Sequence, residues 1–370
     1  MFGGDFMAQG FLRRLKTVLE NEISGRRQQQ VHYISDSSNW SFKWDAHYIT
    51  QGIARRLGGV VPITADPWNL RHQILIYGNR YAWFFGPRQR LHRSNKVVVT
   101  WFHGDSSDTD QSMQKMFKQL PAVFDHVDRV VVTCEHSAQV LIEQGVPADK
   151  LVKIPLGVDL DRFTPPDAEQ KQKIRGRLGI PKDAFCIGSF QKDGTGWEEG
   201  VEPKLLKGPD VFLETMALLK NDQPNLMVLL TGPARGYVKN GLDKLGIPYK
   251  HKFFEEYFDV IPYYQALDLY LIASRGEGGP KALLEGWACG VPMVSTKVGM
   301  STDIIVSGEN GFLADIADSQ ELANHISLLI SNHALREKCR AGALETIKKY
   351  DWQQIGDDYV EMVRGLSSRI

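Results

Sequence analysis

The chain alternates short runs of β-branched residues with helical patterns along most of its length, and this alternation is the strongest constraint on its fold. Runs such as Val97-Val98-Val99 and Val130-Val131-Val132 are apolar on both faces, as strands of a parallel sheet covered by helices are. Strands are predicted at residues 31–35, 59–63, 73–77, 96–102, 129–134, 151–154, 185–190, 226–231, 251–254, 269–273 and 291–296. Helices are predicted at residues 46–57, 112–121, 137–144, 209–219, 237–245, 261–267, 280–288, 319–331 and 333–349. This order predicts an α/β protein with two Rossmann-like, doubly wound domains that face each other across a cleft.

Proline and glycine residues between positions 155 and 166 indicate the linker between the two halves. We therefore predict an N-terminal domain at residues 1–160 and a C-terminal domain at residues 161–350. Residues 351–370 are expected to form a helix that crosses back to the N-terminal domain. Open α/β sheets bind ligands at their carboxyl edges, so the cleft between the domains is the expected site.

Composition and charge exclude several classes of function. The 370 residues carry 44 basic and 44 acidic side chains, so no global positive field favours nucleic acid. No run of 18 apolar residues could span a membrane, and the four cysteines form no CxxC pair. The first residues do not follow the pattern of a secretory signal, so a cytoplasmic location is expected. Oligomeric state has no signal in the sequence.

The apolar positions of residues 11–23 fall on one helical face, whereas Arg13, Arg14 and Lys16 fall largely elsewhere. A basic amphipathic helix of this kind is typical of peripheral membrane contact. The same pattern is also that of a helix packed on the first domain, and both interpretations stay open.

The segment from Ser274 to Glu285 follows a predicted strand and opens a helix near Pro280. Its glycines allow close approach of a ligand, and the unpaired N–H groups of a helix start favour a phosphate. Glu277 and Glu285 are eight residues apart, so one carboxylate can face a sugar while the other faces a ribose. The alternative is a pair of glutamates that complement the helix dipole or lie in solvent.

Two lysines are candidates for gripping a diphosphate. Lys192 follows the predicted strand 185–190, and Lys207 opens the next helix in the sequence Lys207-Gly208-Pro209-Asp210. Ordinary solvated lysines are the alternative. The intervening Gly194–Gly200 run resembles a dinucleotide fingerprint, but Pro203 and polar residues separate it from the next helix, which argues against a nicotinamide cofactor.

His103 follows the predicted strand 96–102 and is expected at the cleft, where it can orient a sugar hydroxyl. Asp36, Asn39, Trp40 and Trp44 interleave polar and aromatic groups in the predicted loop after the first strand, a combination that suits an acceptor sugar but also core packing. The acidic pairs Asp108/Asp110 and Asp159/Asp161 lack a third ligand, so we predict no metal site and no cofactor.

These motifs together resemble the GT-B glycosyltransferases, and within them the large retaining, family 4-like group that includes bacterial mannosyl- and glucosyltransferases. The resemblance covers residues 96–350 well and the first 95 residues poorly. It is carried by EGGPKALLEGWACGVPMV at residues 277–294, IPLGVDLDRFTP at 154–165, KGPD at 207–210 and SGENGFL at 307–313.

The resemblance implies roles for individual residues. Glu277 matches the glutamate near the donor sugar, Lys207 the lysine that stabilises the departing diphosphate, and His103 a histidine near the acceptor and donor sugar. Glu285 matches the glutamate that binds the donor ribose. The remaining donor-site residues are expected to be Lys192, Gly232, Gly278, Gly279, Pro280, Lys281 and Ala282.

Two positions depart from the family pattern. Lys192 stands where an arginine is usual, and Ser35–Trp40 replaces a glycine pair after the first strand. The resemblance implies a metal-independent, retaining transfer of a hexose from a nucleotide-diphosphate sugar to a hydroxyl of a glycan, glycolipid or small molecule. A nucleotide-sugar epimerase, a phosphorylase-like enzyme and a non-catalytic paralogue that binds sugar nucleotides remain alternatives.

Overall fold

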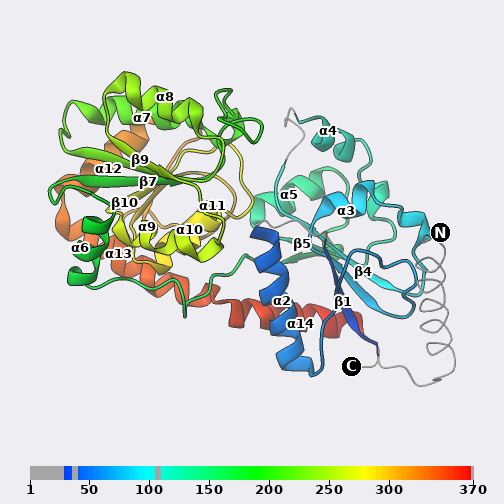
Figure 1. Cartoon of the computed structure of the whole chain (residues 1–370). Coiled ribbons are helices and arrows are strands. Elements are labelled where there is room, and N and C mark those ends of the chain that lie inside the picture. Colours follow the sequence, from blue (N-terminus) through cyan, green and yellow to red (C-terminus); the bar gives the residue numbers. More distant parts are fainter. Residues whose placement is uncertain (1–28, 36–40, 105–109, 368–370) are drawn as a thin grey trace, which may run out of the picture.

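The computed structural model describes residues 29–35, 41–104 and 110–367, which form two α/β domains (Figure 1). The N-terminal domain is built on a parallel sheet with the strand order β2-β1-β3-β4-β5-β6. Its strands are β1 (Val31–Ile34), β2 (Ile63–Thr64), β3 (Ile74–Tyr77), β4 (Lys96–Trp101), β5 (Arg129–Val132) and β6 (Leu151–Lys153). Its helices are α2 (Ser41–Leu57), α3 (Arg80–Phe85), α4 (Gln111–Phe117) and α5 (Glu135–Glu143).

The C-terminal domain repeats the design with a second parallel sheet of order β12-β11-β10-β7-β8-β9. Its strands are β7 (Phe185–Phe190), β8 (Leu226–Thr231), β9 (Tyr249–Lys252), β10 (Leu269–Ile272), β11 (Met293–Thr296) and β12 (Phe312–Ala314). Its helices are α6 (Ala168–Arg177), α7 (Pro209–Lys220), α8 (Gly236–Leu245), α9 (Ile261–Ala266), α10 (Lys281–Ala288), α11 (Met300–Ile304), α12 (Ser319–Ser331) and α13 (His333–Ile347).

The central strands are buried along their whole length, which is why they form parallel sheets. Every residue of β3 and of β8 is buried, so both faces of each strand need cover. Helices supply it on both faces of each sheet, and four apolar clusters fill the interfaces. The predicted fold class, two doubly wound Rossmann-like domains, is therefore confirmed.

The last helix, α14 (Trp352–Leu366), leaves the C-terminal domain and lies beside α2 of the N-terminal domain (Figure 1). The two helices approach closely because Gly52 meets Gly356, where a Cβ on either residue would lie within 3 Å of the other's Cα. Near the domain junction, the ring of Trp352 stacks on Tyr48 with centroids 5.4 Å apart. The two domains are thus joined by packing as well as by the linker.

Local differences from the predictions have simple causes. The predicted strand 59–63 is reduced to Ile63–Thr64, because Gly58 and Gly59 adopt positive φ and Pro62 has no N–H to pair. Helix α2 begins at Ser41 rather than at the predicted residue 46. Trp44 therefore lies on a helix, whereas the sequence predicted it in a loop. Residues 11–23 and Asp36, Asn39 and Trp40 lie outside the described residues. None of the described helices is both long and apolar enough to cross a membrane.

The strand order reverses between β10 and β7. These strands are neighbours in the sheet, although 78 residues separate the end of β7 from the start of β10. In such sheets the loops on the two sides of the reversal diverge and leave a crevice at the carboxyl edge. The loops after β7 and β10 therefore meet at this edge, and it faces the N-terminal domain.

Candidate active site in the cleft between the domains

A cavity of about 400 Å³ lies between the two domains and is lined by residues of both. Eleven of the predicted site residues line it: His103, Lys192, Lys207, Gly232, Glu277, Gly278, Gly279, Pro280, Lys281, Ala282 and Glu285. These residues come from four separate loops and one helix start. Their convergence makes this cavity the candidate active site.

The loop between β10 and α10 carries most of this set. Gly278 lies directly against the N-terminal domain, since a Cβ there would fall 1.7 Å from the carbonyl oxygen of Phe102. Only glycine permits this contact. Pro280 is the N-cap of α10, which begins at Lys281, so the unpaired N–H groups of its first turn lie at the cavity.

Lys207 and Glu277 form an ion pair inside the cavity. Lys207 Nζ lies 2.6 Å from Glu277 Oε1, and Ser274 Oγ donates a hydrogen bond of 2.9 Å to the same oxygen. Gly208 adopts a left-handed conformation, and a Cβ there would lie 1.8 Å from the Ala273 carbonyl oxygen. The glycine after Lys207 thus lets the β7–α7 loop approach the end of β10.

Glu285 is buried and accepts hydrogen bonds from two tyrosines. The Tyr257 hydroxyl donates to its Oε1, and the Tyr264 hydroxyl donates to its Oε2 at 2.7 Å. Burial raises the pKa of Glu285, and the two tyrosine hydrogen bonds oppose that rise. A carboxylate has about four lone-pair positions, so Glu285 can still accept a ligand hydroxyl beside the tyrosines.

His103 is held neutral. Burial lowers its pKa well below the ordinary value of 6.5, and Arg80, Lys207 and Lys204 lower it further. Its Nδ1 atom is buried and has no hydrogen-bond partner in the described part of the chain. A neutral imidazole that lines the cavity is suited to a substrate hydroxyl.

Lys192 lines the cavity, but its ammonium group lies over the ring of Trp197, 3.8 Å from the ring centroid. The loop that carries both residues is anchored by a fully buried ion pair between Asp193 and Arg235. Arg235 also donates to Ser189 and to the Thr231 carbonyl oxygen at 2.7 Å, which ties the ends of β7 and β8 together. Lys192 therefore lines the cavity with its ammonium group held in a cation–π contact.

The N-terminal domain contributes two side chains on α2. Asp45 is 1% exposed, and its Oδ1 lies 2.6 Å from Lys281 Nζ of the C-terminal domain. Trp44 stacks on Tyr257, with centroids 5.8 Å apart, and meets Phe258 edge-on at 4.6 Å. Trp44 therefore packs at the domain junction beside the cavity. The roles of Asp45 and Tyr257 had no local signal in the sequence, because Asp45 meets Lys281 from 236 residues away and Tyr257 meets Glu285 only through the tertiary fold.

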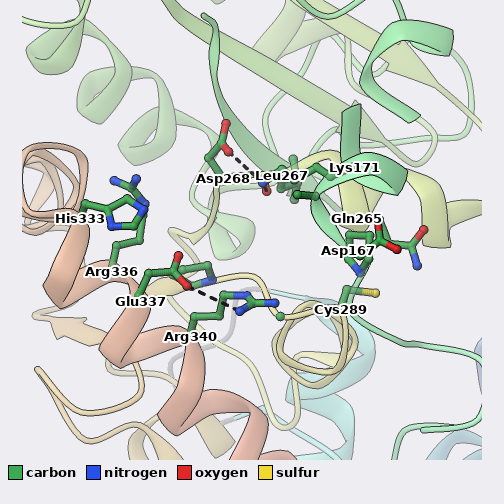
Figure 2. Close-up of a pocket in the computed structure, with 14 residues that line it drawn as sticks. Asp167, Lys171, Gln265, Leu267, Asp268, Cys289, His333, Arg336, Glu337 and Arg340 are labelled. Atoms are coloured by element: carbon green, nitrogen blue, oxygen red, sulfur yellow. Dashed lines mark hydrogen bonds and ion pairs between the residues drawn. The ribbon is translucent and has the colours of Figure 1, made fainter. Parts of the chain in front are cut away.

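A second cavity of about 430 Å³ lies at the opposite edge of the C-terminal sheet, before the starts of β10 and β11 (Figure 2). It contains none of the predicted site residues. Four of its charged side chains form ion pairs with one another: Lys171 with Asp268 at 2.9 Å, and Arg340 with Glu337 at 3.5 Å (Figure 2). Two residues that line the interdomain cavity, Asp45 and His103, each have a buried polar atom without a hydrogen-bond partner among the described residues, Oδ2 and Nδ1 respectively. Within the described residues, no three His, Cys, Asp or Glu side chains cluster as metal ligands would.

Two family models match the chain, one for each domain. The model described as Glycosyltransferase Family 4 matches residues 31–162, and that described as Glycosyl transferases group 1 matches residues 203–346. Among curated relatives, a D-inositol 3-phosphate glycosyltransferase of Stackebrandtia nassauensis is 28% identical over 75% of this chain and 63% of its own length. A protein of the same name from Corynebacterium urealyticum is 27% identical over 84% of this chain and 69% of its own length. The matched segment spans about half to two thirds of such relatives.

Solved structures share the architecture. Anabaena HepE in complex with UDP-glucose superimposes with a TM-score of 0.74 at 17% identity, covering 91% of this chain and all of that one. A glycosyltransferase from Rickettsia africae superimposes with a TM-score of 0.69 at 16% identity, covering 93% of this chain and all of that one. At this level of identity the likeness shows a common fold.

Proposed function

The chain belongs to the GT-B glycosyltransferases of the family 4 type, and from this premise we propose that it transfers a hexose from a nucleotide-diphosphate sugar to an acceptor hydroxyl, with retention of configuration. One observation carries the proposal. His103, Lys207 and the glutamates Glu277 and Glu285, which come from three distant segments of the chain, line a single cavity between the domains. Retention is proposed from the resemblance of residues 277–294 to the retaining group.

The donor diphosphate would lie between the start of α10 and the lysines of the cavity. Lys207 and Lys281 present ammonium groups there, and the first turn of α10 presents backbone N–H groups. Preorganised positive groups of this kind stabilise the charge that develops on a departing phosphate. We therefore propose a reaction in which these groups, rather than a metal ion, stabilise the leaving group.

The sugar would lie beside Glu277. Its Oε1 atom is engaged by Lys207 and Ser274, so the carboxylate is fixed before the donor arrives. A carboxylate held in place can accept sugar hydroxyls without reorganising in the transition state. Glu285, deeper in the C-terminal domain, would accept a ribose hydroxyl.

The acceptor would enter from the side of the N-terminal domain. His103 of that domain lines the cavity, one of its ring nitrogens has no hydrogen-bond partner among the described residues, and its lowered pKa keeps it neutral. A neutral imidazole can accept a hydrogen bond from a hydroxyl of either sugar. The relatives' names make inositol phosphates the first acceptors to try.

The proposal is tested by incubating the protein with UDP-, GDP- and ADP-sugars in the presence of myo-inositol phosphates and simple glycosides. We expect release of one nucleoside diphosphate that depends on an acceptor, and an α-linked product from an α-linked donor by NMR. Interconversion of two sugar nucleotides without release would favour an epimerase. Nucleotide binding without any turnover would favour a non-catalytic paralogue.

A further inference from the structure

Asp45 is a buried acid for which the proposed reaction has no use. It lies in the first turns of α2, is 1% exposed, and lines the cavity from the side of the N-terminal domain. Its Oδ1 atom pairs with Lys281 across the cleft at 2.6 Å. Its Oδ2 atom is buried and has no hydrogen-bond partner within the part of the chain that the structure describes.

Asp45 belongs to the same cluster as Glu285. Lys281 Nζ, which Asp45 holds, lies 5.8 Å from the centroid of the Tyr257 ring, and the Tyr257 hydroxyl donates to Glu285. Asp45 is also close enough to Glu285 and Tyr257 to raise the pKa of each through its charge. The cluster therefore joins a carboxylate from each domain around one part of the cavity.

The two carboxylates differ in how well they are satisfied. Both oxygens of Glu285 accept tyrosine hydroxyls. Asp45 has one satisfied oxygen and one that is buried without a partner. A buried acceptor without a hydrogen-bond partner is unfavourable, more so when it is charged, so a ligand group that donates a hydrogen bond to Asp45 Oδ2 would be stabilised there.

We propose that Asp45 is a second ribose-binding residue, whose Oδ2 accepts a hydroxyl of the donor nucleotide across the cleft from Glu285. This inference rests on the proposed function. In it, the ammonium group of Lys281 offsets the charge of Asp45 as well as that of the neighbouring diphosphate. Because Asp45 belongs to the N-terminal domain, the nucleotide then contacts both domains.

A purely structural ion pair is the competing account. It explains the contact between Oδ1 and Lys281 but leaves Oδ2 unsatisfied. The two accounts differ in one measurable respect: only a hydroxyl contact makes the contribution of Asp45 depend on a particular hydroxyl of the ligand.

The experiment is a thermodynamic cycle that combines substitution of Asp45 in the protein with removal of a ribose hydroxyl from the ligand. Calorimetry measures the affinities of UDP, 2′-deoxy-UDP and 3′-deoxy-UDP for the wild type, Asp45→Ala and Asp45→Asn; the GDP or ADP series replaces UDP if the wild type prefers that base. In the wild type, removal of the contacted hydroxyl should weaken binding about tenfold to a hundredfold, the range for a hydrogen bond to a charged group. In Asp45→Ala the same removal should weaken binding less than threefold.

The controls separate the possible failures. Asp183→Ala, an exposed aspartate before β7, should keep the wild-type penalty. The Asn variant keeps the shape of Asp45 if the Ala variant does not fold, and its penalty should also be smaller than that of the wild type. An equal penalty in the wild type and both variants, or no penalty in the wild type, overturns the role of Asp45 alone. Failure of the wild type to bind any nucleoside diphosphate overturns the proposed function as well.

Discussion

The Nζ atom of Lys207 lies 2.6 Å from Oε1 of Glu277, although the two residues are 70 positions apart in the chain. They meet because the strands that precede them, β7 and β10, are neighbours where the strand order of the C-terminal sheet reverses. The pair places a cation and a carboxylate on one wall of the interdomain cavity. In the proposed reaction Lys207 stabilises the diphosphate and Glu277 binds the sugar.

Glu285→Gln should weaken binding of the nucleoside diphosphate about tenfold to a hundredfold, because a hydrogen bond to a charged acceptor is lost. Burial raises the pKa of Glu285, so its carboxylate becomes protonated at a higher pH than an ordinary glutamate does. Wild-type affinity should therefore fall as the pH is lowered, and Glu285→Gln should lack that part of the fall. Calorimetry over a range of pH checks both, with the exposed Glu214→Gln as the control. A pH dependence unchanged in the variant would count against Glu285.

His103 should not limit activity near neutral pH. Burial and three nearby cations lower its pKa well below 6.5, so it stays neutral as the pH falls through the ordinary imidazole range. The wild-type pH–rate profile should therefore show no loss attributable to His103 at that pH. Comparison with His103→Asn, which should turn over more slowly at every pH, is the check. An acidic limb near 6.5 that disappears in the variant would contradict this assignment.

Arg235→Met should destabilise the protein by about 3–5 kcal/mol, since it leaves the buried Asp193 without its partner. The double variant Arg235→Met/Asp193→Asn should recover part of that loss. Burial already raises the pKa of Asp193 against the effect of Arg235, so the unpaired acid protonates more readily. The loss should consequently be smaller at acidic than at alkaline pH. Urea unfolding of the wild type, Arg235→Met and the double variant measures this, and a double variant no more stable than Arg235→Met would refute the coupling.

Chelation should leave turnover nearly intact, because the proposed stabilisation of the diphosphate comes from Lys207, Lys281 and the start of α10. The rate of nucleoside diphosphate release is compared before and after EDTA treatment and dialysis. Loss of activity on chelation, with recovery on adding Mg²⁺ or Mn²⁺, would show that a metal takes part.

The sequence was sufficient for the fold class and for the segments that meet at the cleft. Continuous apolar strands and the motif around Glu277 are encoded by neighbouring residues, so they can be recognised in the sequence, and the structure contains both. The position of Trp44 was predicted wrongly, because the polar and aromatic residues 41–45 extend α2 by one turn instead of forming a loop. The contacts of Asp45 with Lys281, and of Tyr257 with Glu285, could not be predicted, since each joins segments that only the tertiary fold brings together.

The most direct test of the account is Glu277→Gln, measured for both binding and turnover. Glu277 is assigned to the sugar, so the free nucleoside diphosphate should bind within a few-fold of wild type while the transfer rate falls steeply. Calorimetry of the nucleoside diphosphate beside the rate of its acceptor-dependent release gives both values on the same preparation. Retained binding with lost transfer is the predicted result. Wild-type turnover in Glu277→Gln, or loss of diphosphate binding together with turnover, would contradict the assignment of this cleft.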